Sequence, residues 1–175
     1  DGCTPIYYAA MNGDLYIIDF LAKHGADVNK ACRGSDGATA MHVAAQKGHT
    51  GAVRILFQLG GNVDITQEDG KTPLHLASKS GHVDVIETLV ELGADVAKVQ
   101  KDGASAVYVA AMSGHVDAID TLVKHGADVS QRTNVGATPV KVAARYGHVD
   151  AIAALVKHGA SVNTSNNNGF SAVKS

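Results

Sequence analysis

The sequence predicts an all-α solenoid, in which short pairs of helices stack side by side and extended, hairpin-like arms join them. The first observation behind this prediction is a repeat. The pairs Asp36-Gly37, Asp69-Gly70 and Asp102-Gly103 recur at an interval of 33 residues. A fixed period of this length is typical of an array of similar structural units. The second observation is that each period carries two apolar stretches at helical spacing.

Five full units and one partial unit cover the 175 residues. The predicted boundaries are 1–35, 36–68, 69–101, 102–134, 135–167 and, for the partial unit, 168–175. The first unit is longer than the others, and its surplus lies in the loop at residues 31–35. Because insertions in solenoids fall in loops, we expect the stacking to continue past it and treat residues 1–175 as a single domain.

The third unit shows the expected elements in order. Asp69-Gly70 predicts a turn, because the Asp side chain bonds nearby backbone and Gly accepts positive φ without steric cost. Thr72 and Pro73 predict the start of a first helix, since Thr caps helices and Pro is tolerated at the first helical position. Gly81 closes this helix and leads into the second.

The second helix of the same unit follows from Val83, Ile86 and Leu89, which recur at helical spacing. Gly93 ends it in the left-handed conformation, and residues 94–100 form the arm to the next unit. Two short helices cannot bury their apolar faces alone, so stacking must do it. Small residues would let the units approach closely: Ala44, Ala45, Ala77, Ala110, Ala111, Ala143 and Ala144.

The strings TPLHLAS at residues 72–78 and GHVDVIETLVELGADV at residues 81–96 resemble ankyrin repeats. The resemblance covers the whole chain. It implies L-shaped units, with arms and first helices on a concave face and second helices on a convex back, and it implies non-enzymatic protein–protein recognition. The chain departs from the motif at Ala40 and Ala106, where the motif has Pro, and at Asp14, where it has His.

Composition excludes several classes of function. The net charge is −2 and the basic residues form no runs, so we expect neither nucleic-acid binding nor attraction to an anionic membrane. No apolar stretch reaches the ~18 residues of a membrane span. No nucleophile has a recognisable base and orienting partner, and the glycines are explained by repeated turns. We therefore expect no enzyme and no cofactor.

Histidine is abundant, but its spacing does not favour a metal site. One histidine per unit forms a column: His49, His82, His115 and His148. Neighbouring packed helices lie roughly 8–10 Å apart, whereas zinc needs ligand nitrogens about 2.0–2.1 Å away. We expect each member to fix the turn between its two helices through a backbone bond. The resemblance implies that His42 and His75 bond the turn of a neighbouring unit. The remaining three are expected at second-helix C-termini: His24, His125 and His158.

The two cysteines, Cys3 and Cys32, lie at predicted loop positions. We expect free thiols, with a disulfide between them as the less favoured alternative. A cysteine count this low fits a reducing intracellular compartment. The expected location is therefore the cytoplasm, with the nucleus as the alternative, and the expected state is a monomer.

The positions that vary among the units lie on the arm tips and first helices, which the resemblance places on the concave face. The basic residues there contrast with the acidic second helices, so we expect an acidic or polar protein or peptide partner. The candidate partner-binding residues are Arg33, Lys47, Lys71, Lys79, Lys101, Tyr108, Met112, Arg145 and Tyr146.

Two alternatives to a natural interaction module stay open. The chain could be an inert architectural spacer, or an engineered ankyrin binder. The second is disfavoured because framework positions themselves vary, as at Met41, Leu74, Val107 and Val140.

One modification is also suggested. The segment LAKHGADVN at residues 21–29 resembles the context in which ankyrin arms are hydroxylated by an asparaginyl hydroxylase, which makes Asn29 a candidate. Asn163 lies in a weaker match, because Ser161 replaces Asp. The interpretation that we favour is that both side chains bond locally within the arm.

The end units carry no obvious polar capping substitutions. We therefore expect apolar residues of the last units to be partly uncovered: Ile152, Leu155, Val156, Phe170 and Val173.

Overall fold

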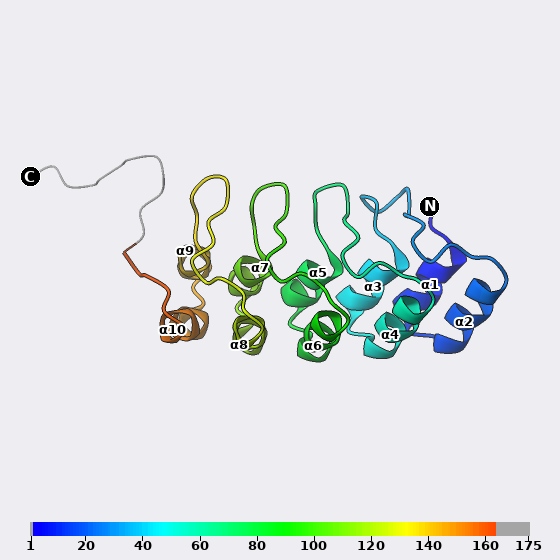
Figure 1. The fold of residues 1–175 in the computed structure, drawn as a ribbon. Coiled ribbons are helices and arrows are strands. Elements are labelled where there is room, and N and C mark those ends of the chain that lie inside the picture. Colours follow the sequence, from blue (N-terminus) through cyan, green and yellow to red (C-terminus); the bar gives the residue numbers. More distant parts are fainter. Residues whose placement is uncertain (1, 164–175) are drawn as a thin grey trace, which may run out of the picture.

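The computed structural model describes residues 2–163 as a row of helix pairs. Figure 1 shows the first helices of the units in one layer, the second helices in a layer beneath them, and the arms rising from the first layer. The helices within this range are α1 (Pro5–Asn12), α2 (Leu15–Lys23), α3 (Ala40–Lys47), α4 (Thr50–Gln58), α5 (Pro73–Ser80), α6 (Val83–Glu91), α7 (Ala106–Ser113), α8 (Val116–Lys124), α9 (Pro139–Arg145) and α10 (Val149–Lys157). The predicted all-α solenoid is confirmed.

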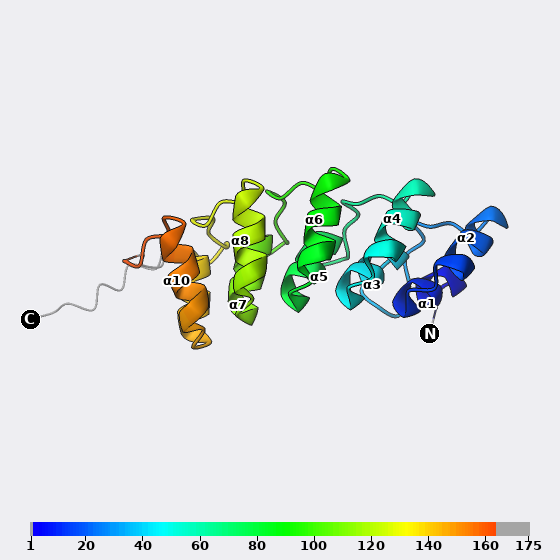
Figure 2. The ribbon, with the colours of Figure 1, turned by 90° about the horizontal axis from the view of Figure 1, so that it is seen from below.

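Each helix pair, with the arm that follows it, is numbered here as units 1 to 5. First helices contact first helices of the next unit, as in α3 with α5, and second helices contact second helices, as in α4 with α6. Figure 2 shows the second helices lying side by side, with α2 and α10 at opposite ends of the row. The predicted partial unit at 168–175, with Phe170 and Val173, lies outside the described residues. In unit 5, Ile152 and Val156 are partly exposed as expected, whereas Leu155 is fully buried because it packs in the core.

The first helices begin and end where the sequence predicts. In unit 3, Thr72 precedes α5 and forms a capping box with His75, while Pro73 occupies the first turn. Gly81 ends the helix with φ +75°, a conformation that glycine adopts without a Cβ penalty. The local residue chemistry therefore sets the bounds of this helix.

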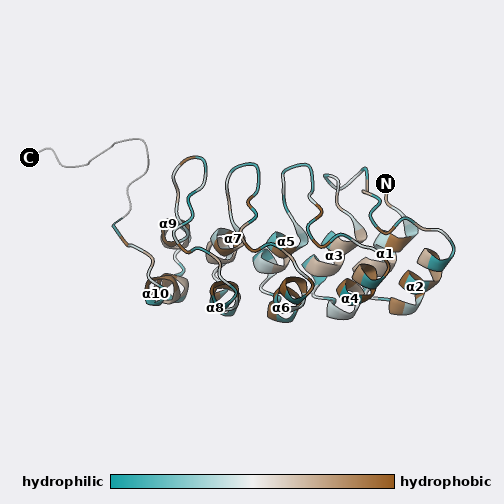
Figure 3. Ribbon diagram, in the orientation of Figure 1, coloured by the Kyte–Doolittle hydropathy of each residue, from teal (hydrophilic) through white to brown (hydrophobic). Residues whose placement is uncertain are grey.

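The core lies between the layers and between the units. In α6, Val85, Ile86 and Leu89 are fully buried. Alanines at the unit contacts are also fully buried, as at Ala44 and Ala77, so neighbouring backbones approach closely. Figure 3 shows hydrophobic residues in both helix layers and mostly hydrophilic arms. Each unit therefore buries its apolar surface against its neighbours, as expected of a solenoid.

The arms are hairpin-like and are bonded to one another. Within one arm, the amide of Gln67 donates to the carbonyl of Lys71 over 2.8 Å. Between arms, the amide of Glu68 donates to the carbonyl of Asp36 over 2.9 Å. The same cross-arm bond joins the amide of Lys101 to Asp69. The arms thus form a second line of contacts that runs beside the helical layers.

The expectation of two free thiols is wrong, because Cys3 and Cys32 form a disulfide. Their Cα atoms lie 4.2 Å apart, although 29 residues separate them in sequence. The amide of Cys32 donates to the carbonyl of Ala38, which places Cys32 in the arm of unit 1, between α2 and α3, whereas Cys3 lies just before α1. Packing of this arm against the segment before α1 brings the two sulfurs together. The bond removes the argument from free thiols for a reducing compartment, so the cytoplasmic location stays a prediction.

Candidate functional site

The first helices and the adjoining arms present a continuous surface, called here the first-helix face. It contains a hollow of about 270 Å³ between units 1, 2 and 3. The hollow is lined by Tyr7, Ser35, Asp36, Ala38, His42, Val43, Gln46, Gln67, Lys71, Leu76 and Lys79. Two predicted site residues, Lys71 and Lys79, therefore lie at the same depression. Polar side chains of α3 and of the second arm complete its wall.

A second cluster lies farther along the same face, in units 4 and 5. Tyr108 is half-buried, and burial raises the pKa of its hydroxyl, as do the electrostatic effects of Asp102 and Tyr146. Arg145 acts in the opposite direction and lowers the pKa. The predicted residues Tyr108, Arg145 and Tyr146 are thus close enough to influence one another. Together they offer an aromatic and cationic surface.

The cations of the two helical layers differ in their partners. On the second helices, Arg54 pairs with Glu91 over 2.8 Å and Lys23 with Asp19 over 2.7 Å. On the first-helix face, Lys71 pairs with Asp69, so its charge is largely neutralised and it contributes less than the sequence suggested. In contrast, five predicted cations form no ion pair among residues 2–163: Arg33, Lys47, Lys79, Lys101 and Arg145.

The remaining predicted residues are spread along the face. Arg33 is exposed in the arm of unit 1, where its amide donates to the carbonyl of Gly2. Met112 is half-buried near the end of α7. The structure therefore gathers five of the nine candidates into two clusters. The other four are not part of either cluster: Arg33, Lys47, Lys101 and Met112. Sequence reasoning did not select Tyr7 or Gln46, which also line the hollow. The residue type at both positions varies among the units, and this variation is the sequence signal that could have identified them.

His42 and His75 are buried and serve structural roles, as the resemblance implied. His75 Nδ1 accepts from the amide of Thr72, and its Nε2 lies 3.2 Å from the carbonyl of Ala104 in the next arm. His42 Nε2 lies 3.0 Å from the carbonyl of Lys71. Burial lowers the pKa of each imidazole to about 4. Both are therefore neutral at pH 7 and tie a first helix to the following arm.

The histidines of the column contact backbone carbonyls, but not in the turn that the sequence predicted. His82 Nε2 lies 3.1 Å from the carbonyl of Gln46, at the end of the preceding first helix. His115 makes the same contact with Lys79 over 3.0 Å. Each member therefore fixes the preceding unit rather than its own turn. The sequence offset alone could not show this, because the distance spanned depends on how the units stack.

The predictions for His158 and for Asn29 have different outcomes. His158 caps the end of α10 as expected, and its Nε2 lies 2.6 Å from a carboxylate oxygen of Asp120. Asn29 does not bond only within its own arm: it donates to the carbonyl of Gly60 and accepts from the amide of Asn62, both in the next arm. Hydroxylation of Asn29 stays a prediction.

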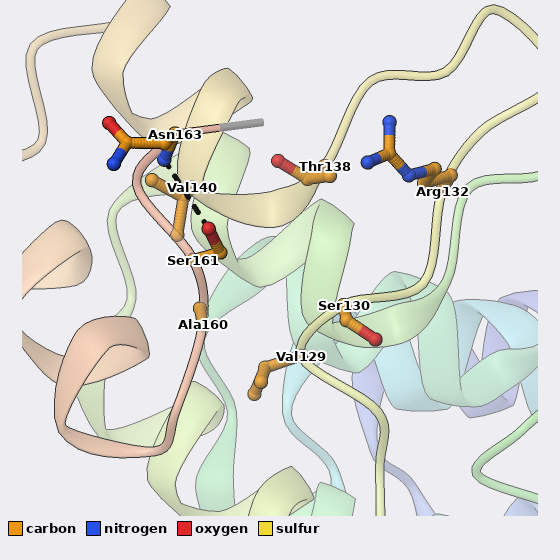
Figure 4. Close-up of a pocket in the computed structure, with 8 residues that line it drawn as sticks. All are labelled: Val129, Ser130, Arg132, Thr138, Val140, Ala160, Ser161 and Asn163. Carbon is orange, nitrogen blue, oxygen red and sulfur yellow. Dashed lines mark hydrogen bonds between the residues drawn. The ribbon is translucent and has the colours of Figure 1, made fainter. Parts of the chain in front are cut away.

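A larger hollow, of about 530 Å³, lies away from the predicted residues (Figure 4). The fourth arm, the start of α9 and the segment after α10 line it with Val129, Ser130, Arg132, Thr138, Val140, Ala160, Ser161 and Asn163. It ends at Asn163, the last described residue. Among these eight described residues, none is a nucleophile placed with a base and an acid in the way that catalysis requires.

Comparison with known proteins agrees with this geometry. A family model described as ankyrin repeats matches residues 7–100 and 93–166. The chain belongs to the ankyrin-repeat family. This family is a protein-interaction module, in keeping with a surface of varied side chains on a regular frame. None of the helices at residues 2–163 has the length and apolar character that crossing a membrane requires.

Relatives share parts of this array. The chain is similar to human protein phosphatase 1 regulatory subunit 27, with 34% identity over 67 residues that cover 38% of this chain and 42% of the relative. It is similar to the Notch-regulated ankyrin repeat-containing protein of Xenopus tropicalis, with 38% identity over 32% of this chain and 47% of the relative. Cortactin-binding protein 2 of Ornithorhynchus anatinus matches at 37% over 35% of this chain and 4% of the relative. The matches thus span less than half of each relative.

Proposed function

We propose that the chain binds a protein or peptide partner through the first-helix face, and that the partner presents acidic or polar side chains there. The observation that carries the proposal is the difference in ion pairing between the two layers. Three of the four cations on the second helices have carboxylate partners within residues 2–163, namely Lys23, Arg54 and Lys124, and Lys157 is the exception. Lys79 and Arg145 on the first-helix face have none within residues 2–163.

An unpaired cation beside a hollow favours a carboxylate from another molecule. Lys79 borders the hollow with Gln46 and Gln67, which can donate further hydrogen bonds to an extended backbone. Tyr108 and Tyr146 supply flat apolar area in units 4 and 5, and aromatic residues of this kind anchor many interfaces. The face therefore suits a segment with acidic groups at units 2 and 3 and an apolar side chain at units 4 and 5.

Selection from a displayed library of random peptides tests the proposal. The immobilised chain should enrich peptides rich in Asp and Glu. Binding of an enriched peptide should weaken about tenfold or more in the double variant Lys79→Glu, Arg145→Glu, because two attractive charges become repulsive. The matched control is Lys124→Glu, Lys157→Glu, which reverses two exposed charges on the second helices. Equal affinity in both double variants would reject the first-helix face.

A further inference from the structure

The arm of unit 1 has a loop at residues 31–37, called here the unit 1 loop, that forms part of the wall of the hollow between units 1, 2 and 3. It contains the residues by which this arm exceeds the arms of units 2 to 4. Its residues Ser35 and Asp36 line the hollow together with Lys71 and Lys79. Asp36 has φ +49° and is the only residue besides glycine with a positive φ in the described part of the chain. Such a conformation persists only where surrounding contacts hold it.

Two contacts join the unit 1 loop to the neighbouring arm. The carbonyl of Ser35 accepts a hydrogen bond from the side-chain amide of Gln67 over 3.4 Å. The carbonyl of Asp36 accepts one from the backbone amide of Glu68 over 2.9 Å. Because Gln67 also lines the hollow, the position of the unit 1 loop determines where this side chain can donate to a bound segment.

The Cys3–Cys32 disulfide ties the unit 1 loop to the start of α1. Cys3 lies two residues before Pro5, where α1 begins, and Cys32 is fully buried. The hydroxyl oxygen of Ser35 lies 3.6 Å from the sulfur of Cys32 and 3.9 Å from that of Cys3. Since the sulfurs of a disulfide carry no hydrogen, the hydroxyl is the donor in both contacts. A continuous line of contacts therefore runs from α1 through the disulfide and Ser35 to the hollow.

Building on the proposed function, we propose that this disulfide is a redox switch for the hollow, and that its reduction weakens the binding of an acidic partner. The reductant is a dithiol. The S–S bond between Cys3 and Cys32 breaks, and the two hydrogens of the dithiol complete a thiol on each cysteine. The dithiol closes to its own disulfide, so that atoms and electrons balance.

Reduction changes the wall of the hollow through packing and through order. Two sulfurs that are not bonded must separate to van der Waals contact, and Cys32 is fully buried, so the unit 1 loop must shift to make room. Ser35 and Asp36 then lose the constraint that holds their carbonyls toward the neighbouring arm. A partner that binds the reduced chain must order this wall, which lowers its affinity. The oxidised chain is therefore the preorganised state.

Fluorescence anisotropy of a labelled Asp- and Glu-rich peptide, selected on the oxidised full chain, measures the switch. Reduction with excess dithiothreitol should raise its Kd about tenfold. The double variant Cys3→Ser, Cys32→Ser should bind with the weaker affinity, with or without dithiothreitol. Circular dichroism confirms that the reduced chain and the variant are folded. Equal affinity of the oxidised and reduced chains overturns the switch but leaves the proposed function intact.

A pair of glutamine variants tests the route from the disulfide to the hollow. Gln67→Ala should weaken binding to the oxidised chain and reduce the ratio between the two redox states, because the side chain held by the unit 1 loop is lost. Gln100 holds the equivalent position in the next arm and does not line the hollow, so Gln100→Ala should keep the ratio of the wild type. An equal ratio in both variants rejects this route.

Amide hydrogen exchange gives a readout that needs no peptide. On reduction, exchange should accelerate at the amides of Cys32 and Glu68, which bond within and to the arm of unit 1. The amides of Gln100 and Lys101 make the same two bonds two units along and should not change. Unchanged exchange at Cys32 and Glu68 overturns the proposal. Failure to select any acidic peptide would instead reject the proposed function, and with it the partner of the switch.

Discussion

Acidification should destabilise this fold through two buried histidines. His42 and His75 are neutral in the folded chain, because burial lowers the pKa of each from 6.5 to about 4. Each ring already uses both nitrogens, one toward its capping threonine and one toward the carbonyl of the next arm. Protonation would place a second proton on Nδ1, which accepts the amide of Thr39 or Thr72. The unfolded chain therefore binds a proton at each of these histidines more readily than the folded chain does.

The size of the loss in stability follows from the difference in histidine pKa between the folded and unfolded states. Above pH 6.5 both states are neutral, so the contribution to stability is fully present. As the pH falls from 6.5 towards about 4, the unfolded chain binds protons that the folded chain does not, and stability is lost. At about 1.4 kcal/mol per pKa unit, the full loss is about 3 kcal/mol for each histidine. By about pH 5 the loss is about 2 kcal/mol for each, or about 4 kcal/mol for the pair.

Urea unfolding at a series of pH values between about 7.5 and 5 measures this loss, in a range where carboxylates stay ionised. The free energy of unfolding should decrease by about 4 kcal/mol, a large share of the stability of a domain, at a constant m value. Tyrosine stands at the same position in units 1 and 4, as Tyr7 and Tyr108. The double variant His42→Tyr, His75→Tyr is therefore a natural control. It should lose stability at pH 7 and have a shallower pH dependence. An equal slope in the wild type and the variant would refute the reasoning.

Two further predictions concern the arms and the turns. Reduction of the Cys3–Cys32 disulfide should lower the free energy of unfolding by about 3–4 kcal/mol, as the 29-residue separation implies; urea curves with and without dithiothreitol measure it, and a Cys32→Ser variant should not respond. Gly81→Ala should cost more than Gly147→Ala. Both glycines have φ near +75°, which costs alanine about 1–2 kcal/mol, but a Cβ at Gly81 would lie 2.7 Å from His115 and one at Gly147 meets nothing within 4 Å. Equal losses in thermal unfolding would contradict the role of the histidine ring.

The sequence could predict the elements because local chemistry encodes them. Thr72 and Pro73 start a helix and Gly81 ends it through their own backbone and side-chain preferences, and the structure has these bounds. Contacts between units are different. The disulfide depends on how closely the arm of unit 1 packs against the segment before α1. The partner of His82 depends on the rise from one unit to the next. Neither quantity is set by a local motif, so both predictions failed.

The candidate site was predictable in part for the same reason. The variation of side chains among the units indicated which positions face outward, and Lys79, Tyr108 and Arg145 do lie on the first-helix face. Sequence could not show that Lys71 pairs with Asp69, or that Lys79 borders a hollow. Both depend on the curvature of an arm over the neighbouring first helix, which only the stacked structure provides.

The contacts between arms suggest why the binding residues lie where they do. His42 and His75 tie their first helices to the next arm. In unit 1 this histidine is replaced by Tyr7, and the Cys3–Cys32 disulfide joins the segment before α1 to the arm of unit 1 instead. In unit 4 it is replaced by Tyr108.

A third contact holds the arms of units 3 and 4 together. The carboxamide of Asn134 donates to the carbonyl of Lys101 over 2.8 Å, and its amide donates to Asp102. Because this bond secures the arm, the side chain of Tyr108 is released from a structural role and lies near Arg145 and Tyr146. Recognition can therefore vary at the histidine position only where another contact holds the arm. This is why Tyr108, rather than His75, is the stronger candidate for contacting a partner.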